Sequence, residues 1–184
     1  MCLGVRVVRM RCTQRSKDKQ LMNAQQYNNL KAPLEKHPQA ANFIVRANKI
    51  ITYLYYVAYP VLLVFLFVQG NTFVWRALLF PALGFLLVTA LRAAINKPRP
   101  YEALDIEPLI HKDTKGKSFP SRHAYSAMAI AVTFFLVNAA VGIPLIVLAL
   151  CMAVVRVMGG VHYPSDVAAG AALGVLFATL EVLV

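Results

Sequence analysis

Residues 50–68, IITYLYYVAYPVLLVFLFV, contain no charged side chain. Residues 72–95, TFVWRALLFPALGFLLVTALRAAI, follow a Gly70-Asn71 turn and carry charge only at Arg76 and Arg92. An α-helix needs about 20 predominantly apolar residues to cross the hydrocarbon core of a bilayer. Both stretches meet that requirement, and they predict two transmembrane helices joined by a short turn.

The rest of the chain has the same character. Hydrophobic residues make up 59% of it and charged residues 15%, whereas about a quarter of the residues of a soluble domain are charged. Further spans are predicted over residues 124–141, from a tight turn at 142–144 to residue 157, and over 167–184, where small residues suit close helix packing. We therefore predict an all-α polytopic membrane helix bundle with about five transmembrane helices.

Residues 1–37 differ from this membrane domain of residues 38–184. They are polar and basic, without an apolar stretch long enough for a signal peptide, and we expect a tail that is partly disordered over residues 1–19. Residues 38–49 alternate at helical spacing, which predicts an amphipathic helix at the membrane interface. The net charge of +11 fits cations beside anionic headgroups, and no feature indicates nucleic-acid binding.

Three clusters of ionisable residues lie at the ends of the predicted spans. They are Arg92-Ala-Ala-Ile-Asn-Lys97-Pro98-Arg99-Pro100, Pro120-Ser121-Arg122-His123 and Arg156-Val-Met-Gly-Gly-Val-His162-Tyr-Pro-Ser-Asp166. In a bundle of five spans, the end of the second, the start of the third and the end of the fourth lie on one side of the membrane. Because ionisable groups are costly at membrane helices, these clusters are the first candidates for a functional site.

The residue types in the clusters suit phosphate. Arginine binds phosphate oxygens through paired N–H groups and keeps its charge when partly buried. Ser121 precedes the first turn of the third span, where its hydroxyl and the following backbone N–H groups can hold an anion. His162 and Asp166 form the pair that a nucleophilic imidazole needs, and His123 is a candidate general acid.

In order and spacing, the clusters resemble the signature of the type 2 phosphatidic acid phosphatase family, K-x6-R-P, P-S-G-H and S-R-x5-H-x3-D, over residues 92–166. The resemblance implies that His162 attacks phosphorus and forms a phosphohistidine, while Asp166 orients the imidazole. It implies that His123 protonates the leaving oxygen and then activates water. It also implies that no metal or cofactor takes part, and that the phosphoryl oxygens are bound by Arg92, Arg99, Ser121 and Arg156.

Three positions depart from that signature. Arg92 replaces lysine, which keeps the charge but changes the donor geometry. Arg122 replaces glycine and adds a cation beside the site, which favours a second phosphate group in the substrate. Val155 replaces serine and removes one hydroxyl. Lys97, inside the first cluster, is a further possible phosphate ligand.

We therefore expect a multi-pass membrane enzyme that hydrolyses a lipid phosphate or diphosphate without metal, in phospholipid or polyprenyl carrier metabolism. Arg122 favours a polyprenyl diphosphate over phosphatidylglycerol phosphate or phosphatidate. A lipid phosphotransferase would use the same residues, whereas an anion channel or carrier would need charges along its spans. Metal binding at His162 and Asp166 would need further ligands nearby. The span count, the membrane face of the site and the oligomeric state stay open.

Overall fold

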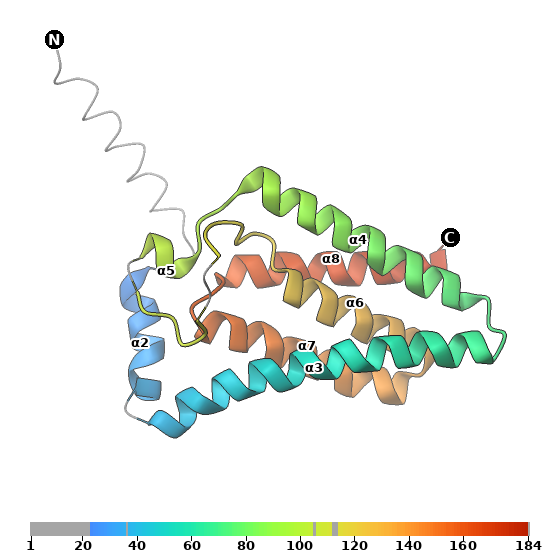
Figure 1. The fold of residues 1–184 in the computed structure, drawn as a ribbon, viewed down its shortest axis with the longest axis horizontal. Coiled ribbons are helices and arrows are strands. Elements are labelled where there is room, and N and C mark those ends of the chain that lie inside the picture. Colours follow the sequence, from blue (N-terminus) through green and yellow to red (C-terminus); the bar gives the residue numbers. More distant parts are fainter. Residues whose placement is uncertain (1–22, 36, 105, 112–113, 184) are drawn as a thin grey trace, which may run out of the picture.

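The computed structural model describes residues 23–35, 37–104, 106–111 and 114–183, and every regular element in that part of the chain is a helix. The tail expected over residues 1–19 lies outside it. The helices are α2 (Ala24–Glu35), α3 (Pro38–Val68), α4 (Phe73–Ile95), α5 (Pro100–Ala103), α6 (Arg122–Val137), α7 (Ala139–Met158) and α8 (Pro164–Leu183). The five long helices form a bundle, and the loops after α4 and α7 meet at one end of it, on the left in Figure 1.

The helical membrane bundle predicted from the sequence is confirmed, but the count of five full spans is not. Four helical segments of the described chain are long and apolar enough to cross a membrane: α3, the segment Phe73–Ala103 that contains α4, α7 and α8. Helix α6, at 16 residues, falls short of that length. It packs against α3, α4, α7 and α8, so it is the central helix of the bundle.

The interfacial helix expected over residues 38–49 and the span expected from residue 50 are one continuous helix, α3. Pro38 occupies its first turn, where the missing N–H group removes no intrahelical hydrogen bond. Residues 39–49 contain neither glycine nor proline, so nothing in the sequence ends the helix between the two segments. Asn48 is therefore part of the same continuous helix as the membrane span.

Helices α6 and α7, which correspond to the third and fourth predicted spans, are joined by a turn at Asn138. The prediction of a turn at residues 142–144 was wrong. Asn138 has extended backbone angles, and its side chain caps α7 by accepting a hydrogen bond from the Ala140 N–H at 2.9 Å. Gly142 lies inside α7, at a point where a side chain would collide with the backbone of Phe135 on α6. This glycine permits a close helix crossing instead of forming a turn.

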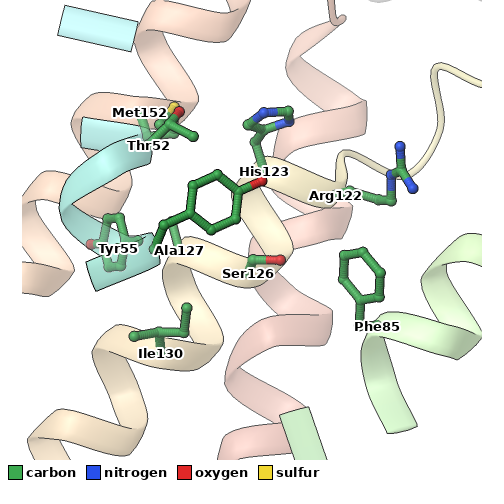
Figure 2. A pocket seen from close by; sticks show the side chains of 10 residues that line it. Thr52, Tyr55, Phe85, Arg122, His123, Ser126, Ala127, Ile130 and Met152 are labelled. Atoms are coloured by element: carbon green, nitrogen blue, oxygen red, sulfur yellow. The ribbon is translucent and has the colours of Figure 1, made fainter. Parts of the chain in front are cut away.

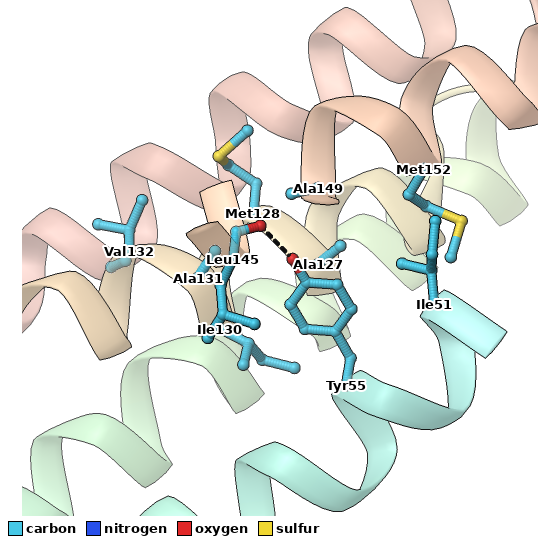
Figure 3. Packing of buried hydrophobic residues seen from close by; sticks show 11 residues of the cluster. Ile51, Tyr55, Ala127, Met128, Ile130, Ala131, Val132, Leu145, Ala149 and Met152 are labelled. Atoms are coloured by element: carbon cyan, nitrogen blue, oxygen red, sulfur yellow. Dashed lines mark hydrogen bonds between the residues drawn. The ribbon is translucent and has the colours of Figure 1, made fainter. Parts of the chain in front are cut away.

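Small residues also bring α8 against α6. A Cβ atom on Gly174 would be 2.7 Å from the Tyr125 carbonyl oxygen, and one on Gly170 would collide with the Ser121 carbonyl oxygen. On the other side of α6, side chains of α3 and α7 complete the core, where the Tyr55 hydroxyl of α3 donates a hydrogen bond to the Leu145 carbonyl of α7 (Figure 3). The predicted close packing of the last helix is thus confirmed at its two glycines.

Gly170→Leu should destabilise the protein by about 1–3 kcal/mol, because the new side chain must push α8 away from the first turn of α6. Ala168→Leu is the matched control, since Ala168 is exposed on the same helix. Thermal unfolding of both variants in the same detergent measures the difference. Equal melting temperatures for the two variants would contradict the close contact between α6 and α8.

Candidate active site

The structure brings the three ionisable clusters together at one end of the bundle. The Ser121 N–H, at the start of α6, donates to the Asp166 carbonyl oxygen of α8 at 2.8 Å. Arg92, in the last turn of α4, donates to the Pro120 carbonyl oxygen at 2.8 Å. The Arg99 guanidinium reaches the Val161 carbonyl oxygen at 3.1 Å. These hydrogen bonds join the end of α4, the start of α6, the loop after α7 and the start of α8 around a single buried centre.

The Asp166 carboxylate lies in the middle of this centre and is fully buried. One oxygen, Oδ1, accepts from Lys97 Nζ at 2.8 Å. The other, Oδ2, accepts from the Ser118 hydroxyl and from the Tyr163 N–H. His162 Nδ1 lies 3.7 Å from Oδ2 and 3.4 Å from the Ser118 Oγ. Asp166 and Ser118 together face one edge of the imidazole.

The His162 imidazole is 1% exposed, and its environment keeps it neutral. Burial, together with the nearby cations of Arg156 and Arg99, lowers the pKa of His162 from 6.5 to about 3, although Asp166 acts in the opposite direction. At neutral pH the contact with Asp166 therefore orients a neutral ring and is not an ion pair. A neutral imidazole has the nitrogen lone pair that a nucleophile requires.

Three arginines surround this pair, and all of them are buried. Arg92 and Arg99 are used largely within the protein, because they hold backbone carbonyl groups of the loops that follow α4 and α7. Arg156, on α7, is only 2% exposed and donates from Nη1 to Asn48 Oδ1 at 3.1 Å. Its Nε and Nη2 groups are buried and have no acceptor among the residues that the structure describes, so they are available to an anion.

Ser121 is the N-cap residue of α6 and is fully buried. Its Oγ accepts from the Ala124 N–H at 3.5 Å, and its own N–H is already used by the Asp166 carbonyl. The backbone N–H of Ser121 is thus occupied, while its hydroxyl proton can still be donated. Of the anion-binding groups expected at this helix start, the Ser121 hydroxyl therefore keeps a proton that it can donate to an anion.

His123 and Arg122 face a cavity of about 230 Å³ that lies between α3, α4 and α6 (Figure 2). Arg122 is exposed, and its guanidinium lies 5.7 Å from the centre of the Phe85 ring, at cation–π distance. Hydroxyl groups of Thr52, Tyr56 and Ser126 also line the cavity. An apolar groove of about 420 Å³ adjoins it, with Tyr56, Phe85 and Ser126 among the shared residues.

The PAP2 superfamily pattern matches residues 73–184 of this sequence, a range that contains all three clusters. The chain belongs to the PAP2 superfamily. The resemblance drawn from the clusters is thereby confirmed. Together with the apolar helices of the fold, the family makes this chain a multi-pass membrane protein.

Two solved PAP2 structures are similar over most of the chain. LpxE of Aquifex aeolicus superposes with a TM-score of 0.67 and 28% identity, covering 91% of this chain and 98% of that one. The PAP2-type phosphatidylglycerolphosphate phosphatase of Bacillus subtilis superposes with a TM-score of 0.57 and 26% identity, covering 84% and 90%. The shared architecture therefore extends beyond residues 73–184.

Among curated relatives, the decaprenylphosphoryl-5-phosphoribose phosphatase of Mycobacterium tuberculosis is 51% identical over 67 residues, covering 35% of this chain and 36% of that protein. The undecaprenyl-diphosphatase BcrC of Bacillus subtilis is 30% identical over 115 residues, covering 60% and 59%. The lipid A 1-phosphatase of Rhizobium johnstonii is 35% identical over 103 residues, covering 54% and 42%. The chain thus spans between about a third and three-fifths of these relatives.

Sequence reasoning missed three residues of this PAP2 site. Ser118 bridges Asp166 and His162, but it is one serine in a polar loop, and only its place three residues before Ser121 sets it apart. Asn48 binds Arg156, and its signal was a polar residue at the start of a membrane span. Tyr27 of α2 donates to the Met158 carbonyl oxygen, although its segment has the composition of a tail. None of these contacts follows from spacing, because each joins segments far apart in the chain.

Metal-type ligands do not gather at the site: the described residues contain no group of three or more His, Cys, Asp or Glu side chains that could hold an ion. His37 and His111 lie outside the three clusters and are exposed.

The burial of neutral His162 should make stability depend on pH. Because its pKa is about 3 when folded and near 6.5 when unfolded, the unfolded chain binds a proton that the folded one does not. The free energy of unfolding should therefore be highest above pH 6.5 and fall by about 1.4 kcal/mol per pH unit towards pH 3. Denaturant unfolding between pH 4 and 7 measures that slope.

His162→Phe should flatten this part of the pH dependence, since phenylalanine fills the site without titrating. His111→Phe, at an exposed position of the long loop, is the matched control and should keep the wild-type slope. The same slope in all three proteins would contradict a neutral buried His162.

Proposed function

We propose that this protein is a lipid phosphatase that hydrolyses a lipid phosphate or lipid diphosphate through a phosphohistidine on His162, without a metal ion. The observation that carries the proposal is the buried Arg156 guanidinium beside the His162–Asp166 pair, because two of its nitrogens, Nε and Nη2, have no acceptor in the described part of the chain. A buried cation with unused donors is costly unless an anion completes it. A phosphoryl group next to a neutral imidazole would do so.

In the first step, a nitrogen of neutral His162 attacks phosphorus while Asp166 stabilises the positive charge that develops on the ring. The bond between phosphorus and the leaving oxygen breaks, and His123 donates the proton which that oxygen needs. Arg156, Arg92 and Arg99 supply the positive field for the charge on the phosphoryl oxygens, and the Ser121 hydroxyl adds a donor. The products are a phosphohistidine and the lipid leaving group.

In the second step, His123 takes a proton from water, and the resulting nucleophile attacks the phosphohistidine. The phosphorus–nitrogen bond breaks, inorganic phosphate leaves and His162 returns to its neutral form. One water is consumed for each phosphate released. The position of His123 on the wall of a cavity supports both of its roles, because the leaving group and then water can reach it there.

The surroundings of His123 support a lipid with a second phosphate, such as a polyprenyl diphosphate. The leaving group must lie beside the general acid, where Arg122 offers a cation and the adjoining groove offers apolar walls. Two of the relatives act, by their names, on substrates that carry a polyprenyl chain and more than one phosphate. Exposed residues of α3 and α4, Tyr56 and Leu86 among them, line the groove, so we expect a hydrocarbon chain to enter it from the bilayer.

The direct test measures phosphate release by the detergent-purified protein in excess EDTA, from undecaprenyl diphosphate, phosphatidylglycerol phosphate and phosphatidate. We expect release to persist in EDTA and to fall at least about 1,000-fold in His162→Ala, because the nucleophile is lost. His111→Ala is the matched control and should keep full activity. His123→Ala should lose about 100-fold or more, since proton transfer contributes on that scale.

Trapping distinguishes the mechanism. A rapid alkaline quench with phosphorus-labelled substrate should capture an acid-labile phosphoenzyme in wild type and none in His162→Ala. An absence of metal-independent release, or equal rates in wild type and His162→Ala, would overturn the proposal. Transfer of label to an added lipid alcohol in preference to water would identify a phosphotransferase instead.

Arg122 provides a test of substrate class. Arg122→Gly, which restores the residue of the family signature, should raise KM for farnesyl diphosphate by about tenfold or more, because a charge-assisted contact is lost. The KM for farnesyl monophosphate should change little. Arg46→Gly, at an exposed position of α3, controls for loss of surface charge. An equal effect of Arg122→Gly on both substrates would show that Arg122 does not recognise a second phosphate.

A further inference from the structure

Lys97 was a possible phosphate ligand by sequence, but its amine is already engaged. Lys97 Nζ lies 2.8 Å from Asp166 Oδ1 and donates to the Ser165 hydroxyl at 3.3 Å. The Asp166 carboxylate is fully buried, whereas the Lys97 side chain is 27% exposed. A carboxylate in such surroundings is stable only when it is paired. Lys97 is the one lysine or arginine in contact with it among the described ion pairs.

Two aromatic rings hold the same ammonium group. Lys97 Nζ lies 4.5 Å from the centre of the Tyr163 ring and 5.6 Å from that of Phe119, both within cation–π range. Tyr163 follows His162 in sequence, and Phe119 follows Ser118. The ammonium group of Lys97 therefore contacts both the segment that carries His162 and the segment that carries Ser118.

We infer that Lys97 is a positioning residue for the reaction: it is the counter-ion of Asp166 and does not bind the phosphoryl group. Moving to a phosphate would require the amine to leave the carboxylate, a hydroxyl and two rings at once. Arg156 already presents two unused donors in the same centre, so the site does not need Lys97 as an anion ligand. This inference rests on the proposed phosphohistidine chemistry.

The action of Lys97 on the nucleophile goes through the carboxylate. By binding Oδ1, Lys97 fixes the rotation of the carboxylate about its Cβ–Cγ bond, so that Oδ2 faces Ser118 and His162. It also keeps Asp166 ionised, which is the state that orients the neutral ring and then stabilises the phosphorylated, cationic one. Without Lys97, Asp166 can turn or take up a proton, and His162 loses its orientation while the phosphate site remains intact.

The test compares wild type with Lys97→Met in kcat, in KM and in inhibition by orthovanadate. Orthovanadate is an analogue of the phosphoryl group in the transition state of its transfer. A positioning role predicts that kcat falls about 10- to 100-fold, as for other residues that orient a catalytic group through a hydrogen bond. KM and the vanadate inhibition constant should stay within about threefold. Arg156→Met is the control for loss of a phosphate ligand. It should weaken vanadate binding strongly, because it removes the two unused donors.

Matched variants complete the design. Lys115→Met, at an exposed lysine of the same loop, should leave all three quantities unchanged, and Lys97→Arg should recover most of kcat by restoring the charge. In an Asp166→Asn background, Lys97→Met should cause no further loss of kcat. If that background is too slow to measure, the vanadate constant of the single variant still decides between the two roles.

The outcomes separate the two proposals. An active, metal-independent wild type in which Lys97→Met raises KM and the vanadate constant together would overturn the positioning role and leave the proposed function standing. An unchanged kcat in Lys97→Met would also overturn the positioning role and leave the proposed function standing. A wild type without metal-independent activity or phosphoenzyme would overturn both.

Discussion

The close contact between the N-terminal parts of α6 and α8 positions the central carboxylate of the site. Gly170 has no side chain, and this allows the backbone of α8 to lie against Ser121. At that distance the Ser121 N–H reaches the Asp166 carbonyl oxygen. The carboxylate of the same residue then stands next to His162. A packing constraint between two membrane helices is thus also the constraint that places the carboxylate beside His162.

An imbalance of charge explains why this centre suits phosphate. Arg92, Arg99 and Arg156 are buried around Asp166, the one fully buried carboxylate of the described site, and that carboxylate is already paired with Lys97. In a region of low dielectric constant, such an excess of positive charge favours any anion that can enter. Arg92 and Arg99 offset part of their desolvation cost by holding loop carbonyl groups, whereas Arg156 keeps two donors unused. Of the three, Arg156 has the fewest protein partners and is therefore the best placed to bind an anion.

The sequence was sufficient to predict what depends on composition and local spacing. Apolar stretches predicted the bundle, and the spacing from Arg156 to His162 and Asp166 predicted residues that the structure indeed brings together. It was insufficient where a residue's partner lies elsewhere in the chain. Gly142 and Pro144 have the composition of a turn, yet Gly142 is needed for a helix crossing with Phe135. Lys97 is in a cluster whose residue types suit phosphate, and only the fold shows that its amine is already bound to the Asp166 carboxylate.

The unit that forms the site is larger than the segment that identifies the family. The segment that leads to His162 is supported by residues that precede position 73: the Tyr27 hydroxyl donates to the Met158 carbonyl oxygen at 3.3 Å, and Asn48 accepts from Arg156. Gly160, with φ of +75°, leaves room for the Tyr27 ring, which a side chain would displace. A nucleophile must be held to within about half an ångström by its supports. Helix α2 and the first half of α3 are therefore part of the scaffold that holds His162, although their polar composition marks them as a tail and a surface helix.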